Sequence, residues 1–301
     1  MTLLLIVCTA RARQEDSMKV ASQNPSPMVD FTRKHDRIEQ KEYAGIAFEI
    51  TGIFSKPVQV FVPRKCVKSE SFDLLIHFHG AAYVTQFAAS QYRGKLIGVT
   101  ISVGSGSKIY DDAFQDTAKF LSLLDTTVAE TRTRLGHHVR IGRVILSGFS
   151  AGYGAIRKII STESNYARVD AVLLLDGFHT SYIPDRKVLA EGGRIDSTGL
   201  LPYMKLAGDA SSGRSRKRFL ITHSEIFPGT FVSTTEATDY LLKTLSMKRT
   251  PVLKWGPLGM QQLSDASKYR LEIMGFAGNT ARDHVDHLQG LFWFLNRLMT
   301  L

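Results

Sequence analysis

The stretch IGRVILSGFSAGYGAIRKII, residues 141–160, decides the fold of this chain. It contains an apolar run, Val144, Ile145 and Leu146, of the kind shown by a strand that is buried on both faces. Apolar residues recur at helical spacing in residues 155–160. The pentapeptide between them, residues 148–152, matches GxSxG, a pattern in which a serine sits on a sharp turn from strand to helix.

The chemistry of this turn centres on Ser150. A strained backbone at the serine needs neighbours without side chains, which Gly148 and Gly152 supply. The free N–H groups at the start of the following helix favour negative charge that develops on an oxygen atom. A turn that uses glycine only for close packing has the same local pattern, so the rest of the chain must distinguish the two interpretations.

The composition is that of a globular protein with a basic surface. Of the 301 residues, 44% are hydrophobic and 10% aromatic, and the formal net charge is +10. A surplus of this size attracts anionic groups, although the densest basic run, residues 214–218, is most simply a solvated loop. The sequence has no basic and aromatic stripe, and no apolar run approaches the length of a membrane span. We therefore expect neither a nucleic-acid partner nor an integral membrane span.

Residues 1–12 form a candidate signal segment. A short apolar run, residues 2–8, precedes Ala10-Arg11-Ala12, which has the small-x-small form of a cleavage site, although the basic n-region is missing. Cleavage there would imply a secreted or periplasmic protein, whereas a mis-assigned start would leave the protein cytoplasmic. Cleavage would also remove Cys8 and leave Cys66 as the single cysteine, so we expect no internal disulfide.

The rest of the chain divides into an extended lead-in, residues 13–42, and one domain, residues 43–301. Strand patterns alternate with helix patterns along the domain, which predicts a doubly wound, mainly parallel sheet flanked by helices. Residues 177–216 interrupt this alternation after the sixth strand, and we expect a cap-like insertion there. The expected strands are residues 44–50, 58–62, 72–78, 96–103, 144–146, 169–175, 218–222 and 269–276, and the expected helices are residues 112–135, 155–160, 234–245 and 285–298.

Polar residues collect at the carboxyl ends of the expected strands, where function gathers in such a sheet. Nucleophilic acyl chemistry needs a hydroxyl, an imidazole that takes its proton, and a carboxylate that orients the imidazole. All three kinds of group are present at these strand ends, in the set His79 with Gly80, Ser150, Asp176, His223 with Glu225, and His284 with His287.

The domain resembles an α/β-hydrolase of the serine esterase type. It shares the strand order, the glycine turn that carries the serine (the nucleophile elbow), an insertion of cap length, and a histidine in the loop before the last helix. The chain order of serine, acid and histidine also matches the triad order of that fold. The resemblance implies Ser150 as the nucleophile and the N–H of Ala151 as one oxyanion donor. Residues 79–82 read HGAA where many such esterases have HGGG, so Ala81 is expected to be the second donor, with Ala82 in reserve.

Two residues compete for each of the other roles. His284 lies in the loop before the last helix and is preferred as the base over His287, which lies one turn inside that helix. Asp176 directly follows three leucines and is preferred as the acid over Glu225, which follows the next strand. Another carboxylate such as Asp185 stays open. Helix caps and an Asp-Gly turn account for the same residues without any chemistry.

The sequence therefore predicts a serine hydrolase that cleaves a carboxylic ester or a related acyl bond through an acyl-enzyme on Ser150, without a cofactor. The acyl substrate would be a small molecule or a group on a polymer. The positive net charge of the protein would favour an anionic substrate. The insertion offers as pocket lining Phe178, His179, Tyr182 and Tyr203. A catalytically silent binding protein of the same fold is one alternative. The other is a metallohydrolase that uses the cluster His77, His79, His284 and His287.

Overall fold

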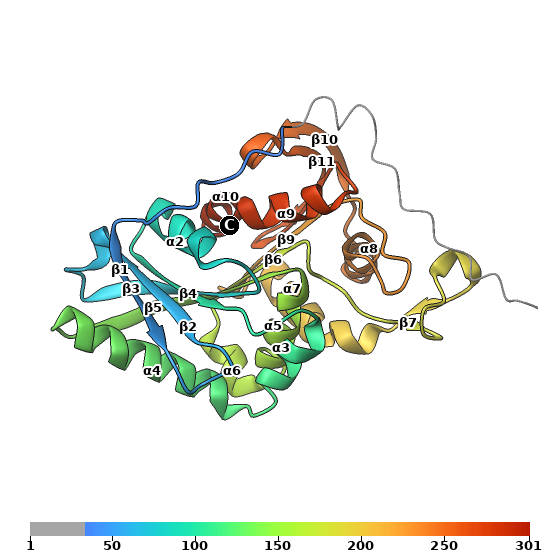
Figure 1. The fold of residues 1–301 in the computed structure, drawn as a ribbon. Coiled ribbons are helices and arrows are strands. Elements are labelled where there is room, and N and C mark those ends of the chain that lie inside the picture. The colour runs from blue at the N-terminus through green and yellow to red at the C-terminus, as the bar shows by residue number, and fades with distance from the viewer. Residues whose placement is uncertain (1–33) are drawn as a thin grey trace, which may run out of the picture.

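The computed structural model describes residues 34–301, and one large sheet forms its centre (Figure 1). Over these residues the sheet has ten strands in the order β1-β2-β4-β3-β5-β6-β9-β12-β11-β10. The strands are β1 (Gly45–Ile50), β2 (Val58–Pro63), β3 (Ser71–Phe78), β4 (Leu96–Ile101), β5 (Arg140–Phe149), β6 (Ala171–Leu175), β9 (Arg218–His223), β10 (Thr250–Trp255), β11 (Gln261–Lys268) and β12 (Leu271–Phe276).

The middle of the sheet is parallel and its two edges are antiparallel. The six neighbouring strands from β4 to β12 all run parallel, whereas β1 and β2 at one edge and β10 and β11 at the other are antiparallel. Every residue of β4, β6 and β12 is buried, as expected for strands that are covered on both faces. The prediction of a mainly parallel sheet flanked by helices is confirmed.

Helices cover both faces of the sheet and enclose two apolar cores. Figure 1 shows α2 and α10 on one side of the sheet and α4 and α6 on the other. Phe294 belongs to the core on the first side and Phe120 to the core on the second. The helices are α2 (Ala82–Gln91), α3 (Ser107–Ala113), α4 (Ala118–Leu135), α5 (Tyr153–Ile159), α6 (Glu163–Arg168), α7 (Leu201–Ser211), α8 (Thr234–Thr244), α9 (Ala281–Gln289) and α10 (Leu291–Leu298).

Several elements differ from the sequence prediction. The helix expected over residues 112–135 is two helices, because α3 ends before Phe114 and α4 begins at Ala118. The helix expected over residues 285–298 is also divided, at Gly290. The sequence pattern did not predict α2 or the hairpin of β10 and β11. Most residues of β10 are exposed and β11 consists mainly of polar residues, so neither strand has the buried apolar pattern on which the prediction rested.

The expected insertion at residues 177–216 is partly a regular helix of the fold. Within it, α7 buries Tyr203 and Leu206 in the core and packs against β9 and β12 of the sheet. Residues 177–200 form the irregular part, which carries a short hairpin of β7 (Tyr182–Ile183) and β8 (Arg194–Ile195). The excursion that lies outside the sheet and its helices therefore ends near Leu200.

The described part of the lead-in, residues 34–42, has no helix or strand but is attached to α9. His35 and Arg37 both bond to the buried carboxylate of Asp286, and the N–H of Ile38 donates to Gln289 Oε1 at 3.0 Å. The candidate signal segment of residues 1–12, with Cys8, and the first part of the lead-in lie outside the described residues. Cys66 is buried and free.

Candidate active site

Ser150 occupies a strained turn between β5 and α5. The strand ends at Phe149, and a short 3-10 turn (Ser150–Gly152) leads directly into the helix. Ser150 has φ 47°, in the left-handed region that residues with side chains rarely adopt. A Cβ added at Gly152 would collide with the carbonyl oxygen of Phe78, and one at Gly177 would lie 2.5 Å from the carbonyl oxygen of Ser150. The two glycines are thus required by close backbone approach.

A histidine and an aspartate pair beside this turn. Nδ1 of His284, in the first turn of α9, lies 2.7 Å from Oδ2 of Asp176, which directly follows β6. The ring of Phe149 packs against the ring of His284 with centroids 4.5 Å apart, so the imidazole lies next to the residue that precedes Ser150. The imidazole is partly exposed and the carboxylate is buried.

Asp176 is held as a carboxylate by its surroundings. Ser224 donates its N–H to Oδ1 at 3.0 Å and its hydroxyl to Oδ2 at 2.7 Å. Burial alone would raise the pKa of Asp176, but electrostatic interaction with His287 and His284 and the hydrogen bonds of His284 and Ser224 outweigh burial. The pKa of Asp176 therefore lies well below its usual range, and the carboxylate orients His284 with Nδ1 protonated.

The competing residues make other hydrogen bonds and ion pairs. His287 is buried and packs between Phe276 and Phe294, and its Nδ1 lies 2.7 Å from Thr222 Oγ1. Glu225 accepts the N–H of Gly278 at 3.0 Å and so ties down the loop that leads to α9. The side chain of Asp185 is 81% exposed and pairs with its neighbour Arg186. Asp176 and His284 are therefore the carboxylate and the histidine that the structure joins by a direct hydrogen bond.

The loop between β3 and α2 presents backbone N–H groups near the glycine turn. His79 has φ 68°, and its N–H donates to the carbonyl oxygen of Ile101. The N–H of Gly80 donates to Ser102 Oγ at 3.0 Å, so it is already used. The next residues are Ala81, which is the N-cap of α2, and Ala82, the first residue of that helix. Since the chain of Phe78 approaches Gly152 closely, this loop adjoins the turn that carries Ser150 and Ala151.

Two further histidines support that loop. His77 is fully buried in β3, and its Nδ1 lies 3.2 Å from Ser147 Oγ. Burial, with a smaller effect of His79, lowers the pKa of His77 to about 3, so the ring is neutral. His79 stacks on Phe149 with ring centroids 5.9 Å apart and bonds to Tyr110 through Nδ1. Burial lowers the pKa of His79 as well.

The four histidines of the metal hypothesis do not form one ligand set within the described residues. The cluster with suitable spacing there is instead His35, Asp283 and Asp286, whose ligand atoms lie within 4.8 Å of one another. Arg37 pairs with Asp286, and Asp283 caps α9 through Thr280. These carboxylates therefore already serve the lead-in and the helix start, and a cation would compete with a guanidinium.

A cavity of about 640 Å³, the Ser150 cavity, opens at the turn. Arg157 and Asp111 form an ion pair on its polar side. His179 lies between Tyr153 and Phe231 on its aromatic side, with ring centroids 5.6 and 5.0 Å away. The residues that line it are Gly106, Ser107, Lys108, Asp111, Ser150, Ala151, Tyr153, Arg157, His179, Thr180, Ser181, Asp196, Gly199 and Phe231.

Of the four aromatic residues expected to line a pocket, only His179 lines the Ser150 cavity. Phe178 and Tyr203 instead pack edge to face in the core. The hydroxyl of Tyr182 donates to Glu236 at 2.7 Å. Ser224, which donates two hydrogen bonds to Asp176, was not among the residues expected at the site. It follows β9 directly, so the rule that polar residues gather at strand ends could have found it.

The comparisons with known proteins give a distant structural similarity and no match at the level of sequence families. No family model matches the chain, and no curated protein matches it. Among solved structures, the acylaminoacyl peptidase of Pyrococcus horikoshii, in an orthorhombic crystal form, is similar with 15% identity and a TM-score of 0.44. The similarity covers 86% of this chain but only 42% of the peptidase. At this distance the peptidase's activity does not transfer to this chain, and function must be argued from the chain's own residues.

No helix in the described part of the chain is a candidate for a membrane span. Over residues 34–301, none is both long enough and apolar enough to cross a bilayer.

Proposed function

We propose that this chain is a serine hydrolase of the α/β-hydrolase type that cleaves a carboxylic ester or a related acyl bond. The observation that carries the proposal is the 2.7 Å contact between His284 Nδ1 and Asp176 Oδ2, beside the strained turn at Ser150. A serine on such a turn, next to a histidine that is oriented by a buried carboxylate, is the arrangement that activates a hydroxyl as a nucleophile.

The first half of the reaction forms an acyl-enzyme. The proton on Nδ1 is directed to Asp176, so Nε2 of His284 carries the lone pair that accepts the hydroxyl proton of Ser150. The serine oxygen attacks the carbonyl carbon and forms a C–O bond, and the negative charge moves to the carbonyl oxygen. The N–H groups of Ala151 and Ala81 stabilise that oxyanion. His284 then gives its proton to the leaving oxygen as the old acyl bond breaks.

The second half releases the acid. A water molecule gives a proton to His284 and attacks the acyl carbon, and the oxyanion forms again at the same donors. The bond to Ser150 breaks, and the serine oxygen recovers the proton from His284. Charge and atoms balance without any metal ion or cofactor. Because Asp176 stays ionised throughout, it stabilises the imidazolium that is present in both transition states.

The Ser150 cavity supports an acyl substrate with both polar and flat parts. The ion pair of Arg157 and Asp111 offers hydrogen bonds without a net charge. Tyr153, His179 and Phe231 offer ring faces and edges on the other side. A volume of about 640 Å³ accommodates a molecule of the size of a common small ligand or the end of a longer chain.

Labelling with a serine-reactive fluorophosphonate tests the nucleophile. The proposal expects one labelled site at Ser150, which Ser150→Ala removes. Ser161→Ala is a matched control, because Ser161 is exposed just beyond the end of α5 and its hydroxyl bonds only to the carbonyl oxygen of Lys158. Ser161→Ala should label like the wild type. Labelling at another residue, or none in a folded protein, would contradict the proposal.

Hydrolysis of p-nitrophenyl acetate tests the partners. His284→Ala and Asp176→Asn should each lower kcat by about 10³-fold to 10⁴-fold, since a serine loses its base or the base loses its orientation. Unchanged rates in both variants would refute the assigned roles. Complete absence of turnover in the folded wild type would favour a silent binding protein, and loss of activity with a chelator but not with the serine reagent would favour a metallohydrolase.

A further inference from the structure

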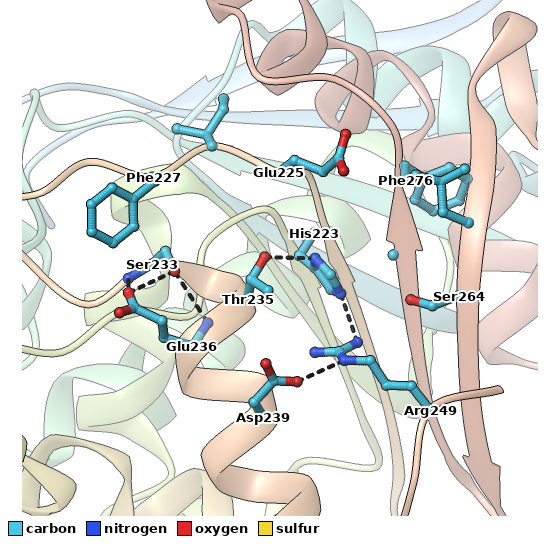
Figure 2. A pocket seen from close by; sticks show the side chains of 13 residues that line it. His223, Glu225, Phe227, Ser233, Thr235, Glu236, Asp239, Arg249, Ser264 and Phe276 are labelled. Carbon is cyan, nitrogen blue, oxygen red and sulfur yellow. Dashed lines mark hydrogen bonds and ion pairs between the residues drawn. The ribbon is translucent and has the colours of Figure 1, made fainter. Parts of the chain in front are cut away.

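A second cavity, the Arg249 cavity, lies beyond the carboxyl end of β9 and shares no lining residue with the Ser150 cavity. Its volume is about 460 Å³, and its walls come from β9, α8, β11, β12, the loop after β9 and the loop before β10, which carries Arg249 (Figure 2). It is lined by His223, Glu225, Ile226, Phe227, Ser233, Thr235, Glu236, Asp239, Arg249, Leu263, Ser264, Gly275 and Phe276.

One wall of the Arg249 cavity is a fixed network around the guanidinium. Nε of Arg249 donates to Asp239 at 2.7 Å, Nη1 donates to His223 Nε2 at 2.7 Å, and Nη2 donates to Thr238. The other ring nitrogen of His223 lies 3.0 Å from Thr235 Oγ1. Burial and the charge of Arg249 lower the pKa of His223 to about 4, so the imidazole is neutral. Each nitrogen of the guanidinium therefore already donates to a protein group.

The carboxylates outnumber the cations in this cavity. Asp239 balances Arg249. Glu236 is held by hydrogen bonds from Ser233 and Tyr182, and Glu225 by one from the N–H of Gly278. Neither glutamate has a cationic partner within residues 34–301. The cavity thus carries a local negative charge on a chain whose formal net charge is +10.

The remaining lining is apolar and partly open. Figure 2 shows Phe227 and Phe276 on opposite sides of the cavity, with the Glu225 carboxylate near its upper edge and the Arg249 network below. Phe227 is 41% exposed, so its ring is available to a ligand. A preformed apolar space with two uncompensated carboxylates suits a ligand whose body is apolar and whose end is cationic.

We propose that the Arg249 cavity is a binding site for a small organic cation, an ammonium or guanidinium group on an aromatic or aliphatic body. The apolar body packs against Phe227, Leu263 and Phe276, and the charged end faces Glu225 and Glu236. The arrangement is independent of the acyl chemistry, because neither Ser150 nor His284 borders this cavity.

Phenethylamine is the probe that tests this site, with 2-phenylethanol and 3-phenylpropionate as neutral and anionic compounds of similar shape. Titration calorimetry on the full chain should give binding of the amine, at least fivefold weaker binding of the alcohol, and no detectable binding of the acid. The affinity for the amine should fall as salt is added. Equal affinity for all three compounds, or no binding of the amine at millimolar concentration, would overturn the proposal.

Two phenylalanines on one loop supply a matched pair of variants. Phe227 and Phe231 are each 41% exposed, but Phe227 lines the Arg249 cavity and Phe231 lines the Ser150 cavity. Phe227→Ala should weaken amine binding roughly tenfold, and Phe231→Ala should leave it unchanged. Leu263→Trp, which fills the cavity, should abolish binding. The opposite pattern for the two phenylalanines would place the amine in the Ser150 cavity and refute the assignment.

Discussion

Acid should destabilise the folded chain at pH values well above those at which its carboxylates titrate. Part of this loss in the free energy of unfolding comes from His77. Its pKa is lowered from 6.5 to about 3 by burial. On acidification the unfolded chain takes up this proton first, so the stability is complete above pH 6.5 and is lost as the pH falls towards 3. pH 5 lies about 1.5 units below the ordinary pKa of 6.5, so the free energy of unfolding is lower there by about 2 kcal/mol.

The same histidine lies under the loop between β3 and α2, which carries Ala81, the proposed second oxyanion donor. A Cβ added at Gly80 would lie 2.8 Å from His77 Nε2, so the imidazole is in close contact with that loop. A proton on Nε2 would place a charge in a buried space between Ser147 and Gly80. Acid unfolding and loss of the loop geometry should therefore occur together.

Urea unfolding of the wild type and of His77→Gln at pH 7.5, 6 and 5 measures how much His77 contributes to the pH dependence of the free energy of unfolding. Between pH 7.5 and 5 the wild type should lose about 2 kcal/mol more than the variant, whose side chain does not titrate. The contribution of His223 is present in both proteins and cancels. The lowered pKa of Asp176 stabilises the fold above its ordinary value of 3.8 and is lost only below it, outside this window.

An equal pH dependence in the two proteins would refute the assignment of a buried neutral His77. If His77→Gln does not fold, His223→Gln tests the same linkage at a second buried neutral histidine. The pKa of His223 is lowered to about 4, so at pH 5 the expected difference is again about 2 kcal/mol.

Four further substitutions test contacts that hold the fold together. Gly152→Ala should destabilise the fold by about 1–3 kcal/mol in urea unfolding, because the new methyl group would collide with a backbone oxygen of β3. Arg297→Ala should cost about 3 kcal/mol by the same assay, since it leaves the buried carboxylate of Glu272 without its bidentate partner, and Arg297→Lys should restore part of the loss. Arg37→Ala should speed hydrogen exchange in residues 34–42, because it removes one of the bonds to Asp286 that attach the lead-in to α9, and unchanged exchange would contradict that role.

Local pattern alone determined the parallel sheet and the turn at its centre. A strand that is covered on both faces must be apolar throughout, so the middle strands were visible as uninterrupted apolar runs. The turn at Ser150 was visible because a left-handed serine and a close approach of the backbone require glycine at fixed positions. These constraints act on residues that are close together in the sequence, so the local sequence pattern shows them.

Only the tertiary structure decided which of the two candidate histidines and which of the two candidate carboxylates form a hydrogen bond with each other. His284 and His287 lie about one turn apart on the same helix, and only the rotation of α9 sends the first to Asp176 and the second to Thr222. Asp176 and Glu225 follow adjacent strands, and the path of each loop gives one to the imidazole and the other to Gly278. Helix rotation and loop path depend on packing between segments far apart in sequence, so no local pattern contains them.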